Sequence, residues 1–178
     1  MTAPRVGCGL DVHPFEQGRE CWLGGILLED ETGLAGHSDG DVAAHAICDA
    51  VLGAAGLGDI GEHFPPGDPQ WKGVSGVRML QETARLARAA GWEVANADLT
   101  VVCERPRLSP HRAAMTAAIA GGLAVAVEAV SVKGTTTDRL GFVGRGEGIA
   151  AMAVALLVPA GKRAQLVWRR RGPSPQKR

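Results

Sequence analysis

The sequence lacks the features that mark secreted, disulfide-rich and membrane-spanning proteins. Its four cysteines form no CxxC pair and no dense pattern of the kind that frames small disulfide-bonded domains. Reduced thiols in a cytoplasmic compartment are therefore the simpler interpretation. No charged leader with a long apolar run precedes the first strand-like segment, so we expect neither a signal peptide nor a membrane span.

An excess of positive charge is also missing from most of the chain. Seven of the 19 Lys and Arg residues lie from Lys162 onward, so residues 1–161 carry 12 basic against all 19 acidic residues, a balance of −7. Nucleic-acid binding draws its affinity from Lys and Arg that neutralise phosphates, and this balance argues against a nucleic-acid partner. A phosphorylated substrate remains compatible with it, because a bound metal ion supplies local positive charge.

The length of 178 residues, 46% of them hydrophobic, allows one well-packed core. We expect a single domain over residues 1–161. Residues 162–178 are basic and contain Pro with no periodic apolar face, so we expect a disordered C-terminal tail.

Apolar periodicity predicts an α+β fold. Residues 5–15 and 21–28 are interpreted as two neighbouring, paired strands, and the helix that begins at Asp41 has Ser38 and Asp39 upstream as candidate caps. We expect a single-domain two-layer sandwich in which one mixed β-sheet has helices packed on one face. The further predicted strands are residues 93–103, 129–133 and 148–158, and the predicted helices are residues 41–56, 74–90 and 109–121.

One group of residues has the composition of a metal site. Asp11 and His13 are two residues apart on a predicted strand, so both side chains project from the same face. His45 lies on the first predicted helix, one turn from Asp41 and from Asp49, either of which is a candidate partner for its ring. Three such ligands suit zinc and leave a fourth position for water or substrate. The alternative is that His45 is an exposed helix residue and the strand end is merely solvated.

Three further segments are open to more than one interpretation. GLGDIG at residues 56–61 matches a dinucleotide fingerprint, but it follows a helix rather than a strand, and we reject that function. The Thr run at residues 134–138 has the composition of a phosphate-binding loop or of a simple turn. The ERPR segment at residues 104–107 fits either a phosphate or base contact or a solvated surface.

Four separated motifs together resemble the 2-C-methyl-D-erythritol 2,4-cyclodiphosphate synthase family in order and spacing. They are GLDVHPF, LAGHSDGDVAAHAICDAVLGAAGLGDIGEHFP, ERPRLSPH and VKGTTTDRLGFVGRGEGIA, and the resemblance runs from Arg5 to Leu157. It implies a lyase of non-mevalonate isoprenoid (terpenoid) biosynthesis. The reaction is the conversion of 4-diphosphocytidyl-2-C-methyl-D-erythritol 2-phosphate into the cyclic diphosphate with release of CMP. The resemblance also implies a homotrimer with sites between subunits, in the cytoplasm or in a plastid-like stroma.

The resemblance assigns the metal ions and the groups that assist the reaction. Asp11, His13 and His45 would hold a divalent metal, usually zinc, and a second cation, Mg²⁺ or Mn²⁺, would lie on the diphosphate. The implied catalytic residues, as stabilisers of the transition state, are His37 and Thr136. The residues implied to bind substrate are Asp11, His13, His37, Ser38, Asp59, Ile60, Gly61, Phe64, Asp68, Cys103, Pro106, Arg107, Ser109, Thr135, Thr136, Asp138, Phe142 and Arg145.

A few positions depart from the pattern of the family. Pro66 and Gly67 stand where Asp and a small polar residue are common, which leaves Asp68 as the carboxylate there. Asp138 replaces the usual Glu and is shorter by one methylene, and Arg107 replaces Lys with a different donor geometry. Two other functions stay open: a zinc-dependent phosphohydrolase, and a non-catalytic trimer that binds isoprenoid diphosphates.

Overall fold

The structure of the chain is a computed structural model that describes residues 3–29 and 31–162. Its main feature is a four-stranded mixed sheet in the order β1-β6-β4-β5. Strand β6 is antiparallel to both β1 and β4, and β4 and β5 run parallel. The predicted mixed sheet is thereby confirmed. Its strands are β1 (Arg5–Pro14), β4 (Trp92–Val102), β5 (Val130–Thr135) and β6 (Gly148–Pro159).

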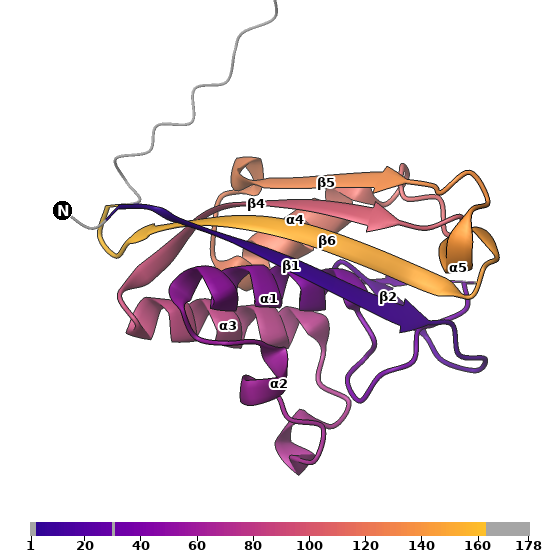
Figure 1. The fold of residues 1–178 in the computed structure, drawn as a ribbon, viewed down its shortest axis with the longest axis horizontal. Coiled ribbons are helices and arrows are strands. Elements are labelled where there is room, and N and C mark those ends of the chain that lie inside the picture. The colour runs from indigo at the N-terminus through magenta and orange to yellow at the C-terminus, as the bar shows by residue number, and fades with distance from the viewer. Residues whose placement is uncertain (1–2, 30, 163–178) are drawn as a thin grey trace, which may run out of the picture.

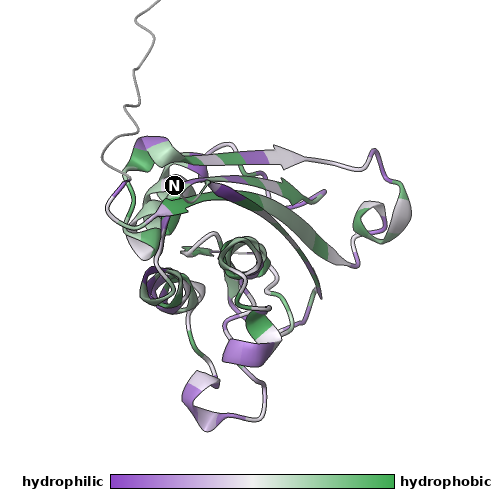
Figure 2. Cartoon of the chain, turned by 60° about the vertical axis from the view of Figure 1, so that its left-hand side comes forward, coloured by the Kyte–Doolittle hydropathy of each residue, from purple (hydrophilic) through white to green (hydrophobic). Residues whose placement is uncertain are grey.

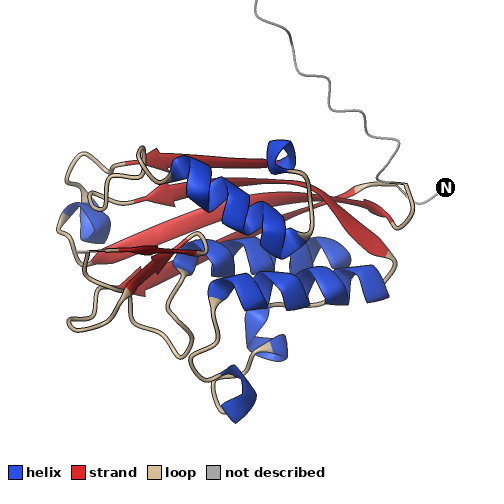
Figure 3. Cartoon of the chain, turned by 180° about the vertical axis from the view of Figure 1, so that it is seen from behind, coloured by secondary structure: helices blue, strands red, loops and turns tan. Residues whose placement is uncertain are grey.

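The three long helices cover one face of this sheet, as the α+β prediction requires (Figure 1 and Figure 3). Figure 2 views the sheet nearly end-on, arched over helices seen along their axes. The helices are α1 (Val42–Ala55), α3 (Gly76–Ala89) and α4 (Arg112–Leu123), close to their predicted ranges. The shorter helical turns, which periodicity did not predict, are α2 (Ile60–His63), α5 (Gly141–Gly144), η1 (Pro69–Trp71) and η2 (Val127–Ala129).

Helix α1 lies directly against strand β1, and two glycines make this approach possible. A Cβ at Gly7 would lie 2.0 Å from the carbonyl oxygen of Ala50, and a Cβ at Gly9 would lie 2.0 Å from that of Ala46. Most of α1 is buried, in keeping with its Ala-rich sequence. The close contact brings the residues of β1 that follow Gly9 within reach of side chains on the first turns of α1.

The predicted strand over residues 21–28 is wrong in two respects. The segment forms two short strands, β2 (Cys21–Leu23) and β3 (Ile26–Leu28), which pair only with each other in a separate two-stranded sheet. Gly24 and Gly25, with φ of 62° and 81°, make the two-residue turn that reverses the chain. Strand β1, expected to pair with this segment, pairs with β6 instead.

The cap of α1 also differs from the prediction, which named Ser38 and Asp39. Asp41 is the N-cap, and its carboxylate accepts hydrogen bonds from the N–H groups of Ala43 and Ala44. Asp39 instead accepts hydrogen bonds from the N–H groups of Asp41 and of Gly76, where α3 begins. The loop before α1 is therefore tied to α3 as well.

The predicted tail over residues 162–178 lies, beyond its first residue, outside the part of the chain that the structure describes. Within residues 3–29 and 31–162 the structure has no helix with the length and apolar character needed to cross a bilayer.

Candidate functional site

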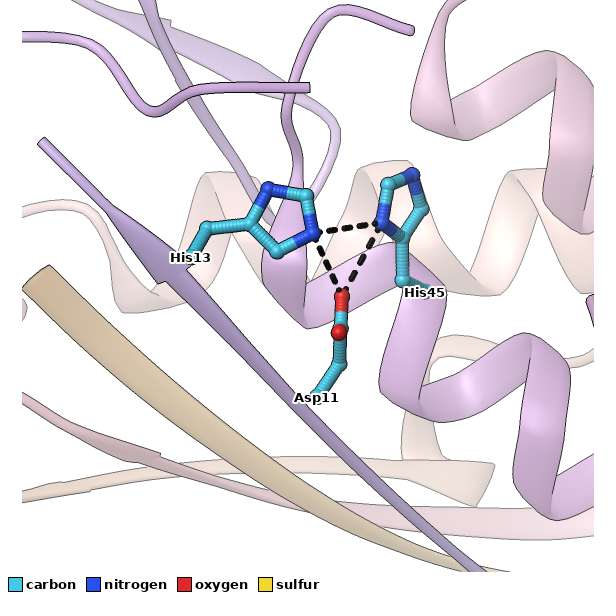
Figure 4. A group of neighbouring side chains, drawn as sticks. All are labelled: Asp11, His13 and His45. Carbon is cyan, nitrogen blue, oxygen red and sulfur yellow. Dashed lines mark hydrogen bonds and ion pairs between the residues drawn. The ribbon is translucent and has the colours of Figure 1, made fainter. Parts of the chain in front are cut away.

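Asp11, His13 and His45 converge at one point between β1 and α1. The Oδ2 atom of Asp11 lies 2.9 Å from Nε2 of His13 and 3.0 Å from Nδ1 of His45, and the two nitrogens are 3.3 Å apart. Figure 4 shows the three side chains pointing toward one another, two from the strand and one from the helix. The predicted metal ligands thus form one cluster, which is a candidate metal site.

The spacing within this cluster suits zinc. Ligands that surround zinc tetrahedrally at about 2.0–2.1 Å lie roughly 3.3 Å from one another. The measured separations of 2.9, 3.0 and 3.3 Å are close to this value, so small shifts would admit the ion. One carboxylate and two imidazoles are also a donor set that zinc accepts, with a fourth position left open.

The second nitrogen of each imidazole has a partner, as is usual for histidines that bind metals. Nδ1 of His13 donates to the carbonyl oxygen of Ala35. Nε2 of His45 shares a hydrogen bond with Oγ of Ser38 at 3.0 Å, and Ser38 is itself buried and accepts a hydrogen bond from the N–H of Gly40. Nε2 of His13 and Nδ1 of His45 both face the Asp11 carboxylate, and these are the nitrogens that would bind a metal ion.

The sequence prediction that Asp41 or Asp49 orients the His45 ring is therefore wrong. The Asp41 carboxylate is fully buried and holds four backbone N–H groups, those of Gly24, Gly25, Ala43 and Ala44. Asp49 accepts a hydrogen bond from the N–H of Ile60. Helical spacing places both carboxylates one turn from His45, yet a serine seven residues earlier in the chain is its partner.

The electrostatics of the cluster favour a cation between the three side chains. Burial raises the pKa of Asp11, but hydrogen bonds and charge attraction from His13 and His45 outweigh burial and hold its pKa well below the usual range. Burial lowers the pKa of His13, whereas the bond to Asp11 raises it, and the net change is upward. Asp11 thus stays anionic and attracts positive charge.

A cavity of about 230 Å³ adjoins the cluster. His13 and His45 form part of its wall, and so does the exposed His37, so a molecule in the cavity would lie beside the metal ligands. The edge-to-face pair of Phe64 and Trp71, with ring centroids 4.8 Å apart, closes the apolar side. The lining residues are His13, Gly36, His37, Ser38, His45, Ile60, Gly61, Phe64, Pro66, Trp71, Val74 and Met79.

The short helix α2 brings Ile60 and Gly61 to this cavity. Asp59 is its N-cap and accepts hydrogen bonds from the N–H groups of Gly61 and Glu62, while Asp49 on α1 holds the N–H of Ile60. Asp59, predicted to bind substrate, does not line the cavity itself. Its carboxylate fixes the start of α2, which determines where Ile60 and Gly61 lie.

A wider cavity of about 700 Å³ continues from the first around His37 and Ser38. Asp68, another predicted substrate residue, lies in its wall, with its Oδ1 accepting a hydrogen bond from the N–H of Gln70. Two cationic residues that sequence reasoning did not single out, Arg19 and Lys72, also line it. The space next to His37 is therefore bordered by positive charge.

Most of the remaining predicted substrate residues line a third cavity, of about 230 Å³, at the other side of the sheet. It lies where β4 and β5 end and where α4 begins, and it shares no lining residue with the cavity beside the metal ligands. Its predicted members are Cys103, Pro106, Arg107, Ser109, Thr135 and Thr136, and its other members are Glu104, Leu108, Arg112 and Gly134.

The loop after β5 carries Thr136 and Asp138 in a restrained backbone conformation. Asp138 and Arg139 have φ of 51° and 64°, which non-glycine residues adopt at a cost. The Glu104 carboxylate accepts hydrogen bonds from the N–H groups of Thr137 and Arg139, and these bonds hold its pKa below the usual range. The Asp138 carboxylate is 3.5 Å from Oγ1 of Thr136.

Phe142 and Arg145, also predicted to bind substrate, lie apart from the three cavities on and just after α5. Phe142 is 40% exposed, and the guanidinium of Arg145 pairs with Glu147 at 2.7 Å. In a single chain, these two residues do not join either group of predicted site residues.

The register of the sheet gives the distance between the metal-ligand cluster and the residues that line the third cavity. Asp11 lies opposite Ala151, Ala151 opposite Val101, and Val101 opposite Gly134, one residue before Thr135. Strands are about 4.8 Å apart, so three steps across the sheet amount to roughly 14 Å. Within one chain, the metal ligands and the Thr135 region thus lie at opposite edges of the sheet.

Comparison with known proteins places the chain in a family. A family model described as the YgbB family matches residues 4–158. The 2-C-methyl-D-erythritol 2,4-cyclodiphosphate synthase of Xanthomonas oryzae pv. oryzae is 55% identical over 153 residues, which cover 86% of this chain and 94% of that protein. The bifunctional enzyme IspD/IspF of Erythrobacter litoralis is 60% identical over 154 residues, 86% of this chain and 40% of that enzyme. The chain thus spans about two fifths of the bifunctional relatives it matches.

Solved structures agree with this result. The bifunctional IspDF from Campylobacter jejuni has a TM-score of 0.83 at 41% identity, over 87% of this chain and 42% of that one. A CDP-bound 2C-methyl-D-erythritol-2,4-cyclodiphosphate synthase has a TM-score of 0.79 at 38% identity, over 86% of this chain and 100% of that one. The Plasmodium falciparum IspF complex with CDP has a TM-score of 0.76 at 30% identity, over 89% of this chain and 98% of that one. The fold, the metal-ligand cluster and these matches together establish that the chain belongs to the YgbB family.

Proposed function

We propose that this protein converts 4-diphosphocytidyl-2-C-methyl-D-erythritol 2-phosphate into 2-C-methyl-D-erythritol 2,4-cyclodiphosphate and CMP. The observation that carries the proposal is the Asp11, His13 and His45 cluster, which opens onto a cavity beside His37. A relative that is 55% identical over 94% of its own length bears the name of this synthase. The closeness of that match supports the same substrate for this chain.

The reaction needs no nucleophile from the protein. An oxygen of the 2-phosphate attacks the β-phosphorus, the bond from that phosphorus to the bridging oxygen breaks, and CMP leaves with that oxygen. Such a transfer is helped mainly by positioning and by neutralising charge on the phosphoryl oxygens. We assign this stabilising role to His37 beside the metal ligands and to Thr136 in the other group.

Two cations complete the proposal. Asp11, His13 and His45 would hold zinc, and the Asp138 carboxylate would help hold Mg²⁺ or Mn²⁺ near the diphosphate. A divalent ion supplies Lewis-acid polarisation of phosphate oxygens when bound. Ala35 and Ser38 would hold the two imidazoles in the tautomers that zinc binding requires.

The cavity at Cys103 and Thr135 is the proposed cytidine site. Two of the related structures have CDP bound, and those proteins share 38% and 30% identity with this chain. Arg107 and Arg112 line the cavity and provide positive charge for a nucleotide phosphate. The methylerythritol portion would then lie against Ile60, Gly61 and Phe64 in the cavity beside the metal ligands.

We further propose a homotrimer in which each complete site is made by two subunits. The metal ligands and the proposed cytidine cavity are about 14 Å apart across the sheet of one chain, so the two halves do not face one another there. The sheet face turned away from the helices is apolar and exposed: Leu10 is 65% and Met152 47% exposed. Burying this face between copies would cover it and bring half-sites of different chains together.

The reaction itself is the first test. The purified protein is incubated with the substrate and Mg²⁺, with and without a zinc chelator, and the products are followed by ³¹P NMR. We expect CMP and a cyclic diphosphate, both lost on chelation and restored by zinc. CMP with a linear phosphate would identify a hydrolase instead, and ligand binding without turnover would identify a binding protein.

The metal ligands are tested by replacing His45 with alanine. Zinc in hundredfold excess over its dissociation constant stabilises a binding protein by about 2.7 kcal/mol, or roughly 5–10 °C in Tm for a chain of this size. We expect this increase in Tm for wild type, no increase for His45→Ala, and no turnover in that variant. His111→Ala, at the start of α4, is the matched control and should keep the increase. A normal zinc response in His45→Ala would contradict the ligand assignment.

A further inference from the structure

The loop that carries His37 is held by its carbonyl groups. Four consecutive carbonyl oxygens, those of residues 35 to 38, accept hydrogen bonds from other segments. The ring of His13 donates to the carbonyl of Ala35, and the N–H of Gly73 donates to the carbonyl of His37 at 2.8 Å. The side chain of Arg19 donates to the other two carbonyls, those of Gly36 and Ser38.

Arg19 lies in the loop between β1 and β2 and reaches across to this segment. Its Nη1 donates to the carbonyl of Gly36 and its Nη2 to the carbonyl of Ser38, both at 2.7 Å. The guanidinium is a rigid fork of donors, and here it spans the two peptide groups on either side of His37. The Glu16 carboxylate, 3.4 Å from Nη1, contributes a weaker restraint on the other side.

The side chain of His37 has no comparable restraint of its own. It is exposed, and among residues 3–29 and 31–162 it makes no hydrogen bond or ion pair. Its position therefore depends on the backbone that carries it. The backbone is fixed mainly by the two bonds from Arg19 and the one from Gly73.

We propose that Arg19 is a positioning residue that sets the location of the His37 imidazole at the reacting phosphates. The proposal rests on the proposed function, in which His37 stabilises the transition state. Misplacing such a group by about 1 Å reduces catalysis by up to roughly a hundredfold. The role assigned to Arg19 is distinct from direct contact with phosphate, which its place in the cavity wall would also permit.

A double-mutant cycle separates these two roles. Arg19→Ala should lower kcat by about tenfold to a hundredfold with little change in KM, since the substrate contacts themselves remain. In a His37→Ala background, the same change should lower kcat by less than about twofold, because the group it positions is gone. Arg19→Lys, which reaches only one of the two carbonyls, should fall between wild type and Arg19→Ala.

The controls address charge and folding. Arg85→Ala removes an exposed guanidinium from α3, paired there with Glu82, and should leave kcat unchanged. Zinc should still raise the Tm of Arg19→Ala, because the ligands lie on β1 and α1. Should Arg19→Ala fail to fold, Arg19→Gln replaces it in the same cycle.

A measurement that needs no turnover accompanies the kinetics. In protein labelled with ¹³C-histidine, the His37 ring signal is assigned by its loss in His37→Ala. We expect Arg19→Ala to shift or broaden this signal and Arg85→Ala to leave it in place. Absence of turnover in wild type would contradict the proposed function, while this signal would still decide the role of Arg19.

Four results would overturn the inference. One is wild-type kcat in Arg19→Ala, and another is an unmoved His37 signal. The third is a double variant whose loss of kcat equals the product of the two single losses, which would mean that Arg19 acts independently of His37. Loss of the zinc-induced rise in Tm in Arg19→Ala would likewise overturn it, because Arg19 would then act on the proposed metal ligands and not on His37.

Discussion

Ser38 is the hydrogen-bond partner of His45, one of the three proposed metal ligands. Its Oγ is hydrogen-bonded to Nε2 of His45 and accepts a hydrogen bond from the N–H of Gly40, and the residue is buried. In the tautomer that would bind a metal through Nδ1, Nε2 of His45 carries the proton and donates it to this oxygen. The hydroxyl would therefore support that tautomer and fix the orientation of the ring.

We expect Ser38→Ala to weaken zinc binding by roughly tenfold to a hundredfold, because partners of ligating histidines typically contribute that much. Competition with a chromogenic chelator measures the affinity directly and without turnover. Ser109→Ala, at the other edge of the sheet, is the matched control. Equal zinc affinity in wild type and Ser38→Ala would mean that the ring is oriented by packing alone.

Cys48 on α1 makes stability depend on pH in the alkaline range. Complete burial raises the pKa of its thiol to about 12, from an ordinary value of 9.0. The unfolded chain loses this proton above pH 9.0 and the folded chain does not, so the stabilisation present at lower pH is lost as pH rises from 9.0 toward 12.

At pH 10, one unit above the ordinary thiol value, this difference costs about 1.4 kcal/mol. We expect Cys48→Ala to lose less stability than wild type between pH 8 and pH 10, by about that amount, in urea unfolding. Because Cys21 and Cys103, with pKa values raised by burial to about 11, lose stability in both proteins, they cancel in the comparison. Parallel pH profiles would contradict the assignment.

At the scale of elements, Asp41 connects the β2–β3 hairpin with α1. Its carboxylate accepts hydrogen bonds from the N–H groups of Gly24 and Gly25 in the hairpin turn and of Ala43 and Ala44 in the first turn of α1. Four N–H donors on one fully buried carboxylate neutralise much of the cost of burying its charge.

We expect Asp41→Asn to lower the free energy of unfolding by about 2–3 kcal/mol, since it removes the charge and turns one acceptor into a donor facing the N–H of Gly25. Urea denaturation measures the loss. Ser75→Ala, which removes the exposed cap of α3, serves as the comparison and should cost about 1 kcal/mol. A smaller effect at Asp41 than at Ser75 would show that the four bonds contribute little.

The elements that could be predicted are those with a repeating signal. Helix α3 has a long run with helical periodicity, and α1 has a long Ala-rich run with no Gly or Pro before Gly53. Strand β1 has Asp11 and His13 on one face, so the candidate metal cluster followed from their spacing. Helices α2 and α5, each of four residues, are too short to show a period. The β2–β3 hairpin differs from the single predicted strand because its Gly-Gly turn lies inside an apolar segment, where apolar content alone does not mark a turn.

The partners of the site residues could not be predicted in the same way. Arg19 meets its acceptors 17 and 19 residues further along the chain, and Glu104 meets its donors 33 and 35 residues away. No local periodicity links such positions. They depend on how loops from different elements meet, which only the folded chain determines.

For the whole molecule, the sheet face turned away from the helices is the surface that favours association with another copy of the chain. Val6 and Leu10 on β1 and Met152 and Val154 on β6 are all exposed, and Leu10 lies directly opposite Met152. A contiguous apolar patch of this kind is uncommon on a monomer. The proposed trimer accounts for it and also explains why the two groups of site residues lie at opposite edges of one chain.

This reasoning predicts that a charge at Leu10 abolishes both assembly and turnover. Leu10→Glu should sediment as a monomer in analytical ultracentrifugation, because a carboxylate buried between apolar faces costs several kcal/mol per copy. Turnover should fall with it, since each proposed site takes its halves from two subunits. Zinc should still raise the Tm, because all three proposed ligands belong to one chain.

Leu27→Glu is the matched control, because Leu27 is also exposed but lies on β3, in the hairpin whose turn packs against α4. Cys8, exposed on the same sheet face as Leu10, gives a second readout: its thiol should react slowly in wild type and rapidly in Leu10→Glu. A Leu10→Glu monomer with full turnover would mean that one chain suffices for catalysis. The two groups of proposed site residues would then have to act together within a single subunit.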